Sequence, residues 1–190
     1  MGALDGRVVL ILGGTGDHGR AVVDELVADG ATVEILDEDA EAARAAARRH
    51  GGPWGRVAHR PLEPGACAEL IRAAVARTVA DRGVLTGIVT VDRSPAEVLA
   101  VLRAARAPLR AARYAAVVLV GSPEQTRTLA EWLADDGVRI NSVRPSGVPL
   151  DTAHAVHFLL SDAAADVTGT DWPAADRDAA IPRRASPTAR

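Results

Sequence analysis

The sequence predicts an α/β fold: a Rossmann-like, doubly wound parallel sheet. Short apolar runs alternate with longer helical patterns, which is the order expected of βαβ units. Of the residues, 48% are apolar and only 3% aromatic, so we expect a core of small aliphatic side chains packed between helices and a sheet. A length of 190 residues suits one domain, which we assign to residues 1–177, followed by a loose tail at 178–190.

Three strands and three helices are expected in the first half of the chain. A glycine-rich turn follows the first strand, and Gly30 ends the helix after that turn. The strands are predicted at residues 7–12, 32–36 and 56–58, and the helices from the glycine-rich turn to residue 29, at 40–50 and at 66–82.

The second half repeats the alternation. Ser94 and Pro95 are a capping serine and a first-turn proline, so a helix should begin there, and Pro108 should interrupt it near its end. The run at 115–120 is apolar at every position, as in a central strand buried on both faces. Further strands are predicted at 86–91 and 138–143, and further helices at 123–136 and 152–161.

Charge and composition argue against two classes of protein. The net charge is −3, and the arginines are spread over helix faces rather than gathered in one basic block, so we expect no nucleic-acid partner. No apolar run approaches the ~18 residues of a membrane span, and no signal peptide precedes the first strand. We therefore expect a cytoplasmic protein with no membrane partner.

Metal and disulfide sites are not predicted either. Cys67 is the single cysteine, which excludes an intramolecular disulfide and a cysteine-rich zinc site. His154 and His157 can share a helix face, but no carboxylate cluster lies near them in the sequence. We expect no metal, and a structural or solvent-facing position for these histidines.

The most informative motif follows the first strand. Residues 14–19, Gly-Thr-Gly-Asp-His-Gly, have the G-x-G-x-x-G spacing between a strand and a helix. Such glycines let the backbone approach a pyrophosphate, and a carboxylate at the end of the second strand hydrogen-bonds an adenosine ribose and repels a 2′-phosphate. The expected cofactor is therefore NAD rather than NADP. The candidate cofactor-binding residues are Gly13, Gly14, Gly16, Gly19 and Asp37.

A second interpretation of this motif stays open, because a glycine turn can also serve only to pack a strand against its helix. Asp17 favours that interpretation, since a negative charge beside a pyrophosphate in a partly dry cleft costs on the order of a few kcal/mol. The same aspartate is also a normal first-turn residue that the helix dipole favours. The sequence leaves cofactor binding undecided.

From residue 6 to about 176 the chain resembles the short-chain dehydrogenase/reductase family, especially its ketoacyl-reductase branch. Residues 8–21 resemble the family's first strand and cofactor turn. Residues 136–145 resemble its late strand motif, and 158–162 with 167–169 resemble its C-terminal signature; these two are the specific matches. The resemblance implies a shortened version of that family's fold and an NAD(P)-dependent oxidation or reduction.

The chain departs from the family at its functional positions. Leu12 and Asp17 stand where the cofactor turn of the family has threonine and glycine, and residues 90–93 replace its Asn-Asn-Ala-Gly segment. Ser122 stands where the catalytic serine would follow the fifth strand. The segment that would carry the catalytic tyrosine and lysine is missing, because Pro123 leads straight into the next helix.

The rest of the sequence supplies no other tyrosine and lysine for the catalytic pair of the family. All 22 basic residues are arginine, Tyr114 is the single tyrosine, and Asn141 is the single asparagine, so the asparagine of the family's fourth helix has no counterpart either. In the family, the lysine lowers the tyrosine pKa from about 10, so that the phenol can exchange a proton while hydride moves. We assign no catalytic residue and treat Ser122 as vestigial, able only to donate a hydrogen bond.

Three polar residues remain near the expected ligand site, and of these a His or an Asp could act as an acid or a base. His18, Asp92 and Arg93 fall at predicted carboxyl ends of strands, the edge where open α/β sheets bind ligands. Their spacing selects none of them, and they can equally be ordinary polar residues of loops.

The leading hypothesis is a catalytically silent family member that serves as a subunit of a heteromeric oxidoreductase. Similar shortened subunits are known in paired ketoreductase-like enzymes that oxidise a carrier-bound β-hydroxytyrosyl group in aminocoumarin antibiotic assembly. The resemblance implies an intact homologue as partner in a heterotetramer, and a β-hydroxy or β-keto substrate on a carrier protein in secondary metabolism. Shortening the start of the fifth major helix should uncover apolar surface for that partner.

Two alternatives stay open. The chain could be a stand-alone non-redox enzyme, such as a cyclase, dehydratase or isomerase, with a closed polar pocket and a histidine or carboxylate of shifted pKa. It could also be a regulatory module that senses NAD, which would bind the cofactor without turning it over.

Overall fold

The computed structural model describes residues 2–51, 55–63 and 68–174. The predicted tail at 178–190 and Cys67 lie outside these residues. The predicted domain boundary near residue 177 lies outside them as well.

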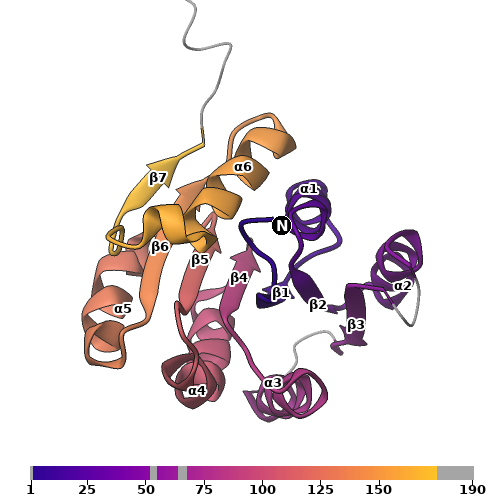
Figure 1. Ribbon diagram of the computed structural model, residues 1–190, viewed down its shortest axis with the longest axis horizontal. Helices are drawn as coiled ribbons and strands as arrows, with labels where there is room; N and C mark the ends of the chain where they lie inside the picture. The colour runs from indigo at the N-terminus through magenta and orange to yellow at the C-terminus, as the bar shows by residue number, and fades with distance from the viewer. Residues whose placement is uncertain (1, 52–54, 64–67, 175–190) are drawn as a thin grey trace, which may run out of the picture.

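A seven-stranded sheet forms the centre of the described part, and its strand pairs are parallel (Figure 1). Its order is β3-β2-β1-β4-β5-β6-β7, so the chain runs outward from β1 to one edge and then from β4 to the other. This is the Rossmann-like, doubly wound sheet that the sequence predicts. The strands are β1 Val8–Leu12, β2 Thr32–Asp37, β3 Val57–Pro61, β4 Gly87–Val91, β5 Ala116–Val120, β6 Arg139–Arg144 and β7 Asp171–Pro173.

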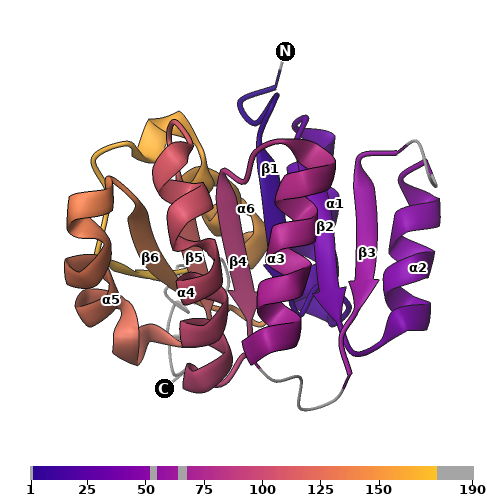
Figure 2. The same ribbon diagram turned by 90° about the horizontal axis from the view of Figure 1, so that it is seen from below.

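Helices cover both faces of the sheet (Figures 1 and 2). Val9 and Ile11 of β1 belong to a core with α1, α2 and α6, whereas Leu10 and Leu12 belong to a core with α3, α4 and α5. Successive strand side chains point to opposite faces, so a strand buried on both faces is apolar at every position. The helices are α1 Asp17–Ala28, α2 Ala40–Arg49, α3 Ala68–Arg82, α4 Pro95–Ala111, α5 Thr126–Leu133 and α6 Pro149–Leu160.

The late strand motif and the C-terminal signature pack against each other. Asn141 on β6 is fully buried; its Nδ2 donates to the carbonyl of Val167 at 2.9 Å, and its Oδ1 accepts from the backbone N–H of Thr170 at 3.1 Å. Thr168 Oγ1 accepts from the backbone N–H of Ile140 at 3.1 Å. The single asparagine therefore holds the turn at 167–170 against β6 and directs the chain into β7.

Three helices differ in detail from the prediction. Pro108 does not interrupt α4, which continues to Ala111, because a missing N–H in the last turn removes one helix bond close to the end. The predicted helix at 123–136 consists of α5 with a 3₁₀ turn at each end. The predicted helix at 152–161 begins earlier, at Pro149, which is a favoured residue for the first turn.

Two strands also differ. β3 is longer than predicted because its pairing with β2 continues as far as Asp37 and Pro61. β7 was not predicted, since it has three residues, all of them exposed, and no apolar alternation. It joins the sheet through parallel pairing with β6, a long-range contact that local sequence does not encode.

Candidate functional site

The glycine turn joins β1 to α1 at the carboxyl ends of the parallel strands, which we call the carboxyl edge of the sheet. The N–H of Gly13 donates to the carbonyl of Leu36 at 3.1 Å, and a Cβ on Gly13 would lie only 2.5 Å from the carbonyl oxygen of Val91. Gly13 also has a φ of +90°, which side chains of L residues rarely allow. Only glycine fits at this position without a shift of the backbone.

The other glycines of the turn have contrasting surroundings. A Cβ on Gly19 would clash with the carbonyl oxygen of Gly13, and one on Gly14 would lie 2.9 Å from Cγ2 of Ile35. Gly16 faces open space and caps α1 without a side-chain hydrogen bond. The turn is closed against the protein at one end and open where the unpaired N–H groups of α1 begin, which fits a diphosphate group.

Asp37 lies beside the turn, and its carboxylate already holds the turn in place. Oδ2 accepts from the N–H of Thr15 at 3.0 Å, Oδ1 accepts from the N–H of Asp39 at 3.1 Å, and the residue is only 4% exposed. A carboxylate has about four acceptor positions, so it has capacity for a ribose hydroxyl as well. Asp37 therefore fixes the shape of the turn in addition to its predicted contact with a ligand.

Asp17 does not face a dry cleft. Its side chain is 76% exposed, and it pairs with Arg20 one turn along α1. Two charges 4 Å apart interact by only about 1 kcal/mol in water. The repulsion that the sequence predicts between Asp17 and a pyrophosphate is therefore much reduced.

The segment after β4 folds over the glycine turn. Arg93 Nε donates to the carbonyl of Val91 at 3.2 Å, and Nη1 lies 3.5 Å from Glu97 Oε1. A Cβ on Gly13 would lie 3.0 Å from Arg93 Nε and 3.1 Å from Nη2. The guanidinium group therefore packs directly on Gly13.

Two more predicted residues meet this segment. Ser122, which follows β5, is 7% exposed, and its Oγ donates to the carbonyl of Arg93 at 3.2 Å. Asp92 has a φ of +49°, and its N–H donates to the carbonyl of Val120 at 3.0 Å. The Ser122 hydroxyl thus donates a hydrogen bond, as expected, and does so to the protein backbone.

His18 completes the group from the first turn of α1. Its Nε2 lies 2.9 Å from the carbonyl of Ser146, in the loop after β6. His18, Asp92 and Arg93 therefore all lie at the carboxyl edge, and that prediction is confirmed.

Tyr114 lies at the opposite edge of the sheet, directly before β5. Arg7 Nη1 donates to its carbonyl at 2.7 Å, and the guanidinium carbons of Arg7 and Arg113 lie 5.3 Å and 4.7 Å from the centre of its ring. β5 lies between Tyr114 and Ser122, and its five residues alone span about 16 Å at 3.3 Å per residue. Tyr114 is too far away to exchange a proton at the glycine turn.

The histidines of α6 have acidic partners that the sequence analysis missed. His157 Nε2 lies 2.7 Å from Asp29 Oδ2, and His154 Nε2 lies 3.9 Å from Glu25 Oε2. Both carboxylates come from the α1 region, more than a hundred residues away, so only the tertiary fold brings them together. Within the described ranges, no three His, Cys, Asp or Glu side chains form a group that could hold a metal ion.

The apolar surface does not lie where the sequence analysis places it. The exposed residues of α5 are polar, and its Trp132 is covered by Arg106, whose guanidinium carbon lies 4.8 Å from the ring centre. The exposed large apolar residues of the described segments include Val148, Leu150 and Trp172, around α6 and β7. The exposed face of α5 is therefore polar rather than apolar.

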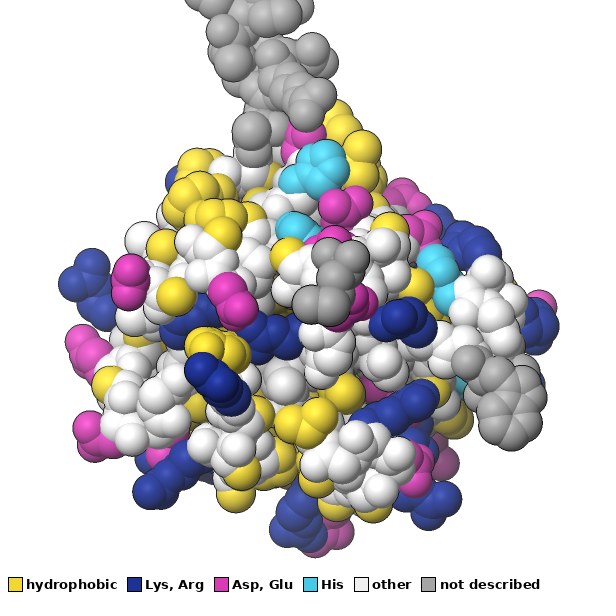
Figure 3. Space-filling model, viewed as in Figure 1, with side chains coloured by type: hydrophobic (Ala, Val, Ile, Leu, Met, Phe, Trp, Pro, Cys, Tyr) yellow, Lys and Arg dark blue, Asp and Glu magenta, His cyan; other side chains and the backbone are white. Residues whose placement is uncertain are grey.

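Charged side chains of both signs are mixed over the face shown in Figure 3, with no single basic block. In the part of the chain that the structure describes, no helix has the length and apolar character needed to cross a membrane.

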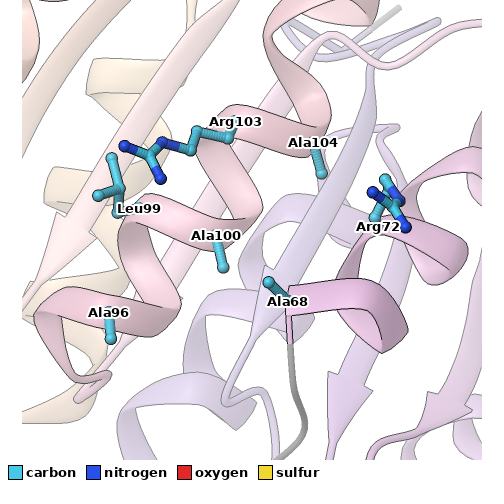
Figure 4. A pocket seen from close by; sticks show the side chains of 7 residues that line it. All are labelled: Ala68, Arg72, Ala96, Leu99, Ala100, Arg103 and Ala104. Carbon is cyan, nitrogen blue, oxygen red and sulfur yellow. The ribbon is translucent and has the colours of Figure 1, made fainter.

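A shallow groove lies between α3 and α4 (Figure 4). Alanines of both helices are among the residues that line it, and it has a volume of about 460 Å³. Arg72 stands on α3, and Arg103 and Leu99 stand on α4. None of the residues that line this groove belongs to the glycine turn.

Comparison with known proteins gives short sequence matches. No family model matches the chain. Over 48 residues it is 46% identical to the cis-1,2-dihydrobenzene-1,2-diol dehydrogenase and to the cis-toluene dihydrodiol dehydrogenase of Pseudomonas putida. The matched stretch covers 25% of this chain and only 18% of the length of each relative.

Solved structures match over most of the chain. A short-chain type dehydrogenase/reductase from Mycobacterium ulcerans has a TM-score of 0.80 at 20% identity, with 90% of this chain and 88% of that chain covered. A hydroxysteroid dehydrogenase from Escherichia coli has a TM-score of 0.80 at 16% identity, with 90% and 95% covered. Because identity is low, these matches establish the architecture alone: the chain has the short-chain dehydrogenase/reductase fold.

Proposed function

We propose that this chain is an NAD-binding homologue of the short-chain dehydrogenases/reductases that lacks their proton-transfer pair, and that it acts as an accessory subunit of a heteromeric NAD(P)-dependent oxidoreductase. The partner would be an intact homologue in a heterotetramer. The reaction of the complex would interconvert a β-hydroxy and a β-keto group on a carrier-bound intermediate of secondary metabolism, as in antibiotic biosynthesis.

The observation that carries this proposal is the separation of the glycine turn from the single tyrosine. The turn lies at the carboxyl edge of the sheet and keeps glycine where a Cβ would collide with the backbone, whereas Tyr114 lies at the amino edge. The sequence contains no lysine that could lower a phenol pKa. The chain thus retains features for holding a dinucleotide without the usual means of moving the substrate proton.

The residues of the site would share the binding of NAD. When bound, this cofactor supplies a hydride acceptor. Gly13 and Gly19 keep the turn compact, Gly16 leaves the start of α1 accessible to the diphosphate, and Asp37 would accept a hydrogen bond from the adenosine ribose. The Ser122 hydroxyl donates a hydrogen bond to the carbonyl of Arg93, so its contribution is to position that segment.

The apolar side chains around α6 and β7 support a protein partner. Val148 is 46% exposed and Leu150 is 50% exposed at the start of α6, and Trp172 of β7 is 36% exposed and packs against the Phe158 ring at 5.4 Å. Val148 and Leu150 lie at the start of α6, whereas Trp172 packs beside Phe158 in the last turns of that helix. Exposed large apolar side chains favour burial against another protein. This region replaces the predicted contact next to α5 as the proposed interface.

Co-expression with an intact reductase homologue encoded beside this chain tests the proposal. We expect a stable complex of both chains whose NAD-dependent turnover of a β-hydroxy thioester requires this subunit. As a matched pair, Leu150→Asp should weaken the complex, while Arg103→Asp on the exposed side of α4 should leave it intact. A monodisperse monomer that neither joins nor affects the homologue would contradict the accessory role, and saturable NAD binding by that monomer would favour an NAD-sensing module.

A further inference from the structure

Arg93, which follows β4, contacts the glycine turn but has no role in the proposed function. Arg93 side-chain atoms lie 3.0 and 3.1 Å from the Cβ position of Gly13, and the side chain is 21% exposed. It is neither a freely solvated surface residue nor part of the core. Its contact with Gly13 is available because Gly13 carries no side chain.

The guanidinium group is held in one orientation by two neighbours. Its Nε donates to the carbonyl of Val91, and its Nη1 faces Glu97, whose other oxygen accepts from the backbone N–H and hydroxyl of Ser94. Burial raises the pKa of Glu97, but the hydrogen bonds from Ser94 and the charge of Arg93 outweigh it and leave this pKa below its usual value. Ionised Glu97 therefore anchors Arg93 at neutral pH.

The carboxylates near the turn make this positive charge important. Asp37 accepts from two backbone N–H groups, Asp17 pairs with Arg20, and Asp92 is exposed next to Gly121. An anion that enters the turn meets the carboxylate of Asp37, which is bonded to the turn itself, as well as the backbone N–H groups. Arg93 is the guanidinium that the structure places against the glycine at the start of the turn, where it can offset this negative charge.

We infer that Arg93 recognises the diphosphate of the bound nucleotide and thereby sets the preference of the cleft for a nucleoside diphosphate; this inference rests on the proposed NAD site. A fixed guanidinium donates charge-assisted hydrogen bonds to phosphate oxygens without losing much side-chain entropy on binding. Nε donates to Val91 and Nη1 faces Glu97. Nη2 lies next to Gly13 and is the nitrogen that we expect to donate to the diphosphate. In this chain, the arginine side chain would donate to the phosphate oxygens in addition to the backbone N–H groups of the turn.

Titration of three probes locates the effect on the phosphates. NAD, ADP and adenosine are titrated separately into the full chain and into Arg93→Ala, with binding measured by calorimetry. We expect the variant to bind NAD and ADP about tenfold to a hundredfold more weakly, because a hydrogen bond to a charged group contributes about 1.5–3 kcal/mol. Adenosine affinity should not change.

Further variants separate charge recognition from folding. Arg103→Ala removes one positive charge from the exposed side of α4, the helix that follows Arg93, and should leave all three affinities unchanged. Arg93→Lys keeps the charge and should recover part of the ADP affinity without the planar fork of donors. Circular dichroism and urea unfolding verify that each variant is folded, and the wild-type ADP affinity should fall with added salt.

The outcomes distinguish this inference from the proposed function. Equal NAD and ADP affinities in wild type and Arg93→Ala, or tighter binding by the variant, would overturn the role of Arg93 while leaving an NAD site in place. An equal loss of adenosine affinity would show that Arg93 merely shapes the cleft. A folded wild-type chain that binds neither NAD nor ADP would overturn both the inference and the cofactor site.

Discussion

The polar cluster at the carboxyl ends of the parallel strands (the carboxyl edge) is built differently from the one at their amino ends (the amino edge). At the carboxyl edge, backbone groups of the glycine turn approach those of neighbouring strands so closely that Gly13 and Gly19 tolerate no side chain. At the amino edge, the contacts are made by long side chains: Arg7 reaches the carbonyl of Tyr114 and pairs with Asp162. The first arrangement leaves an accessible helix start, and the second surrounds a tyrosine with arginines. A tyrosine in this fold is therefore no guarantee of a proton donor at the carboxyl ends of the strands.

The largest expected effect comes from adding a side chain to the carboxyl edge. Gly19→Val should lower the free energy of unfolding by about 1–3 kcal/mol or more, because its Cβ meets the carbonyl of Gly13 rather than a movable side chain. NAD binding should be lost with the geometry of the turn. Urea unfolding and calorimetric titration measure the two effects.

Gly16→Ser is the matched control for this change. Nothing lies within 4 Å of the Cβ position of Gly16, and serine is a favoured N-cap residue, so stability should change by less than about 1 kcal/mol. If both variants retained wild-type stability and NAD affinity, the close packing assigned to this edge would be wrong.

Removing the carboxylate that holds the turn should have the next largest effect. Asp37→Ala leaves the N–H of Thr15 without its partner and should lower the free energy of unfolding by about 1–3 kcal/mol, together with a weaker affinity for NAD. Asp37→Asn keeps one acceptor oxygen and should lose less. Equal losses for Ala and Asn, measured by urea unfolding, would contradict the assigned hydrogen bond.

Much of this contrast could be predicted from sequence, because strand positions and the glycine spacing follow from local patterns. Because parallel strands end on the same side of the sheet, the sequence predicts a ligand site at their carboxyl ends. His18, Asp92 and Arg93 were placed there correctly. The partners of individual side chains could not be predicted. Asp37 with Thr15, and His157 with Asp29, are joined by tertiary packing between segments whose spacing carries no signal.

The surface was the least predictable part. Loss of the segment before α5 was expected to expose apolar residues, but Arg106 covers Trp132 and the exposed positions of α5 are polar. Composition does not reveal which residues of a short helix face solvent. Likewise β7 is defined by its pairing with β6 rather than by an apolar pattern.

Acid should weaken a contact near the amino edge. The hydrogen bond from His157 holds the pKa of Asp29 below its usual value, although burial opposes this. A lowered folded-state pKa stabilises the protein above the unfolded value of about 4, and this contribution disappears as the pH falls through the folded value. Urea unfolding between neutral pH and pH below about 4 should show this loss, and Asp29→Asn should make the acid limb shallower. An unchanged acid limb in the variant would contradict the assigned contact.

The smallest effect is expected at the tyrosine itself. Tyr114→Phe keeps the ring between Arg7 and Arg113 and removes only a hydroxyl on a residue that is 48% exposed, so stability should change by less than about 0.5 kcal/mol. NAD affinity and the turnover of any complex should be unchanged. A large loss of turnover in a folded complex would show that Tyr114 is a proton donor after all.

The most direct test of the account is a titration of NAD into the isolated wild-type chain, with Gly19→Val alongside. We expect saturable one-site binding of NAD to the wild type, weaker binding of NADP in the same experiment, and no binding to the variant. The absence of saturable NAD binding by a folded wild-type chain would contradict the claim that the carboxyl edge is a cofactor site.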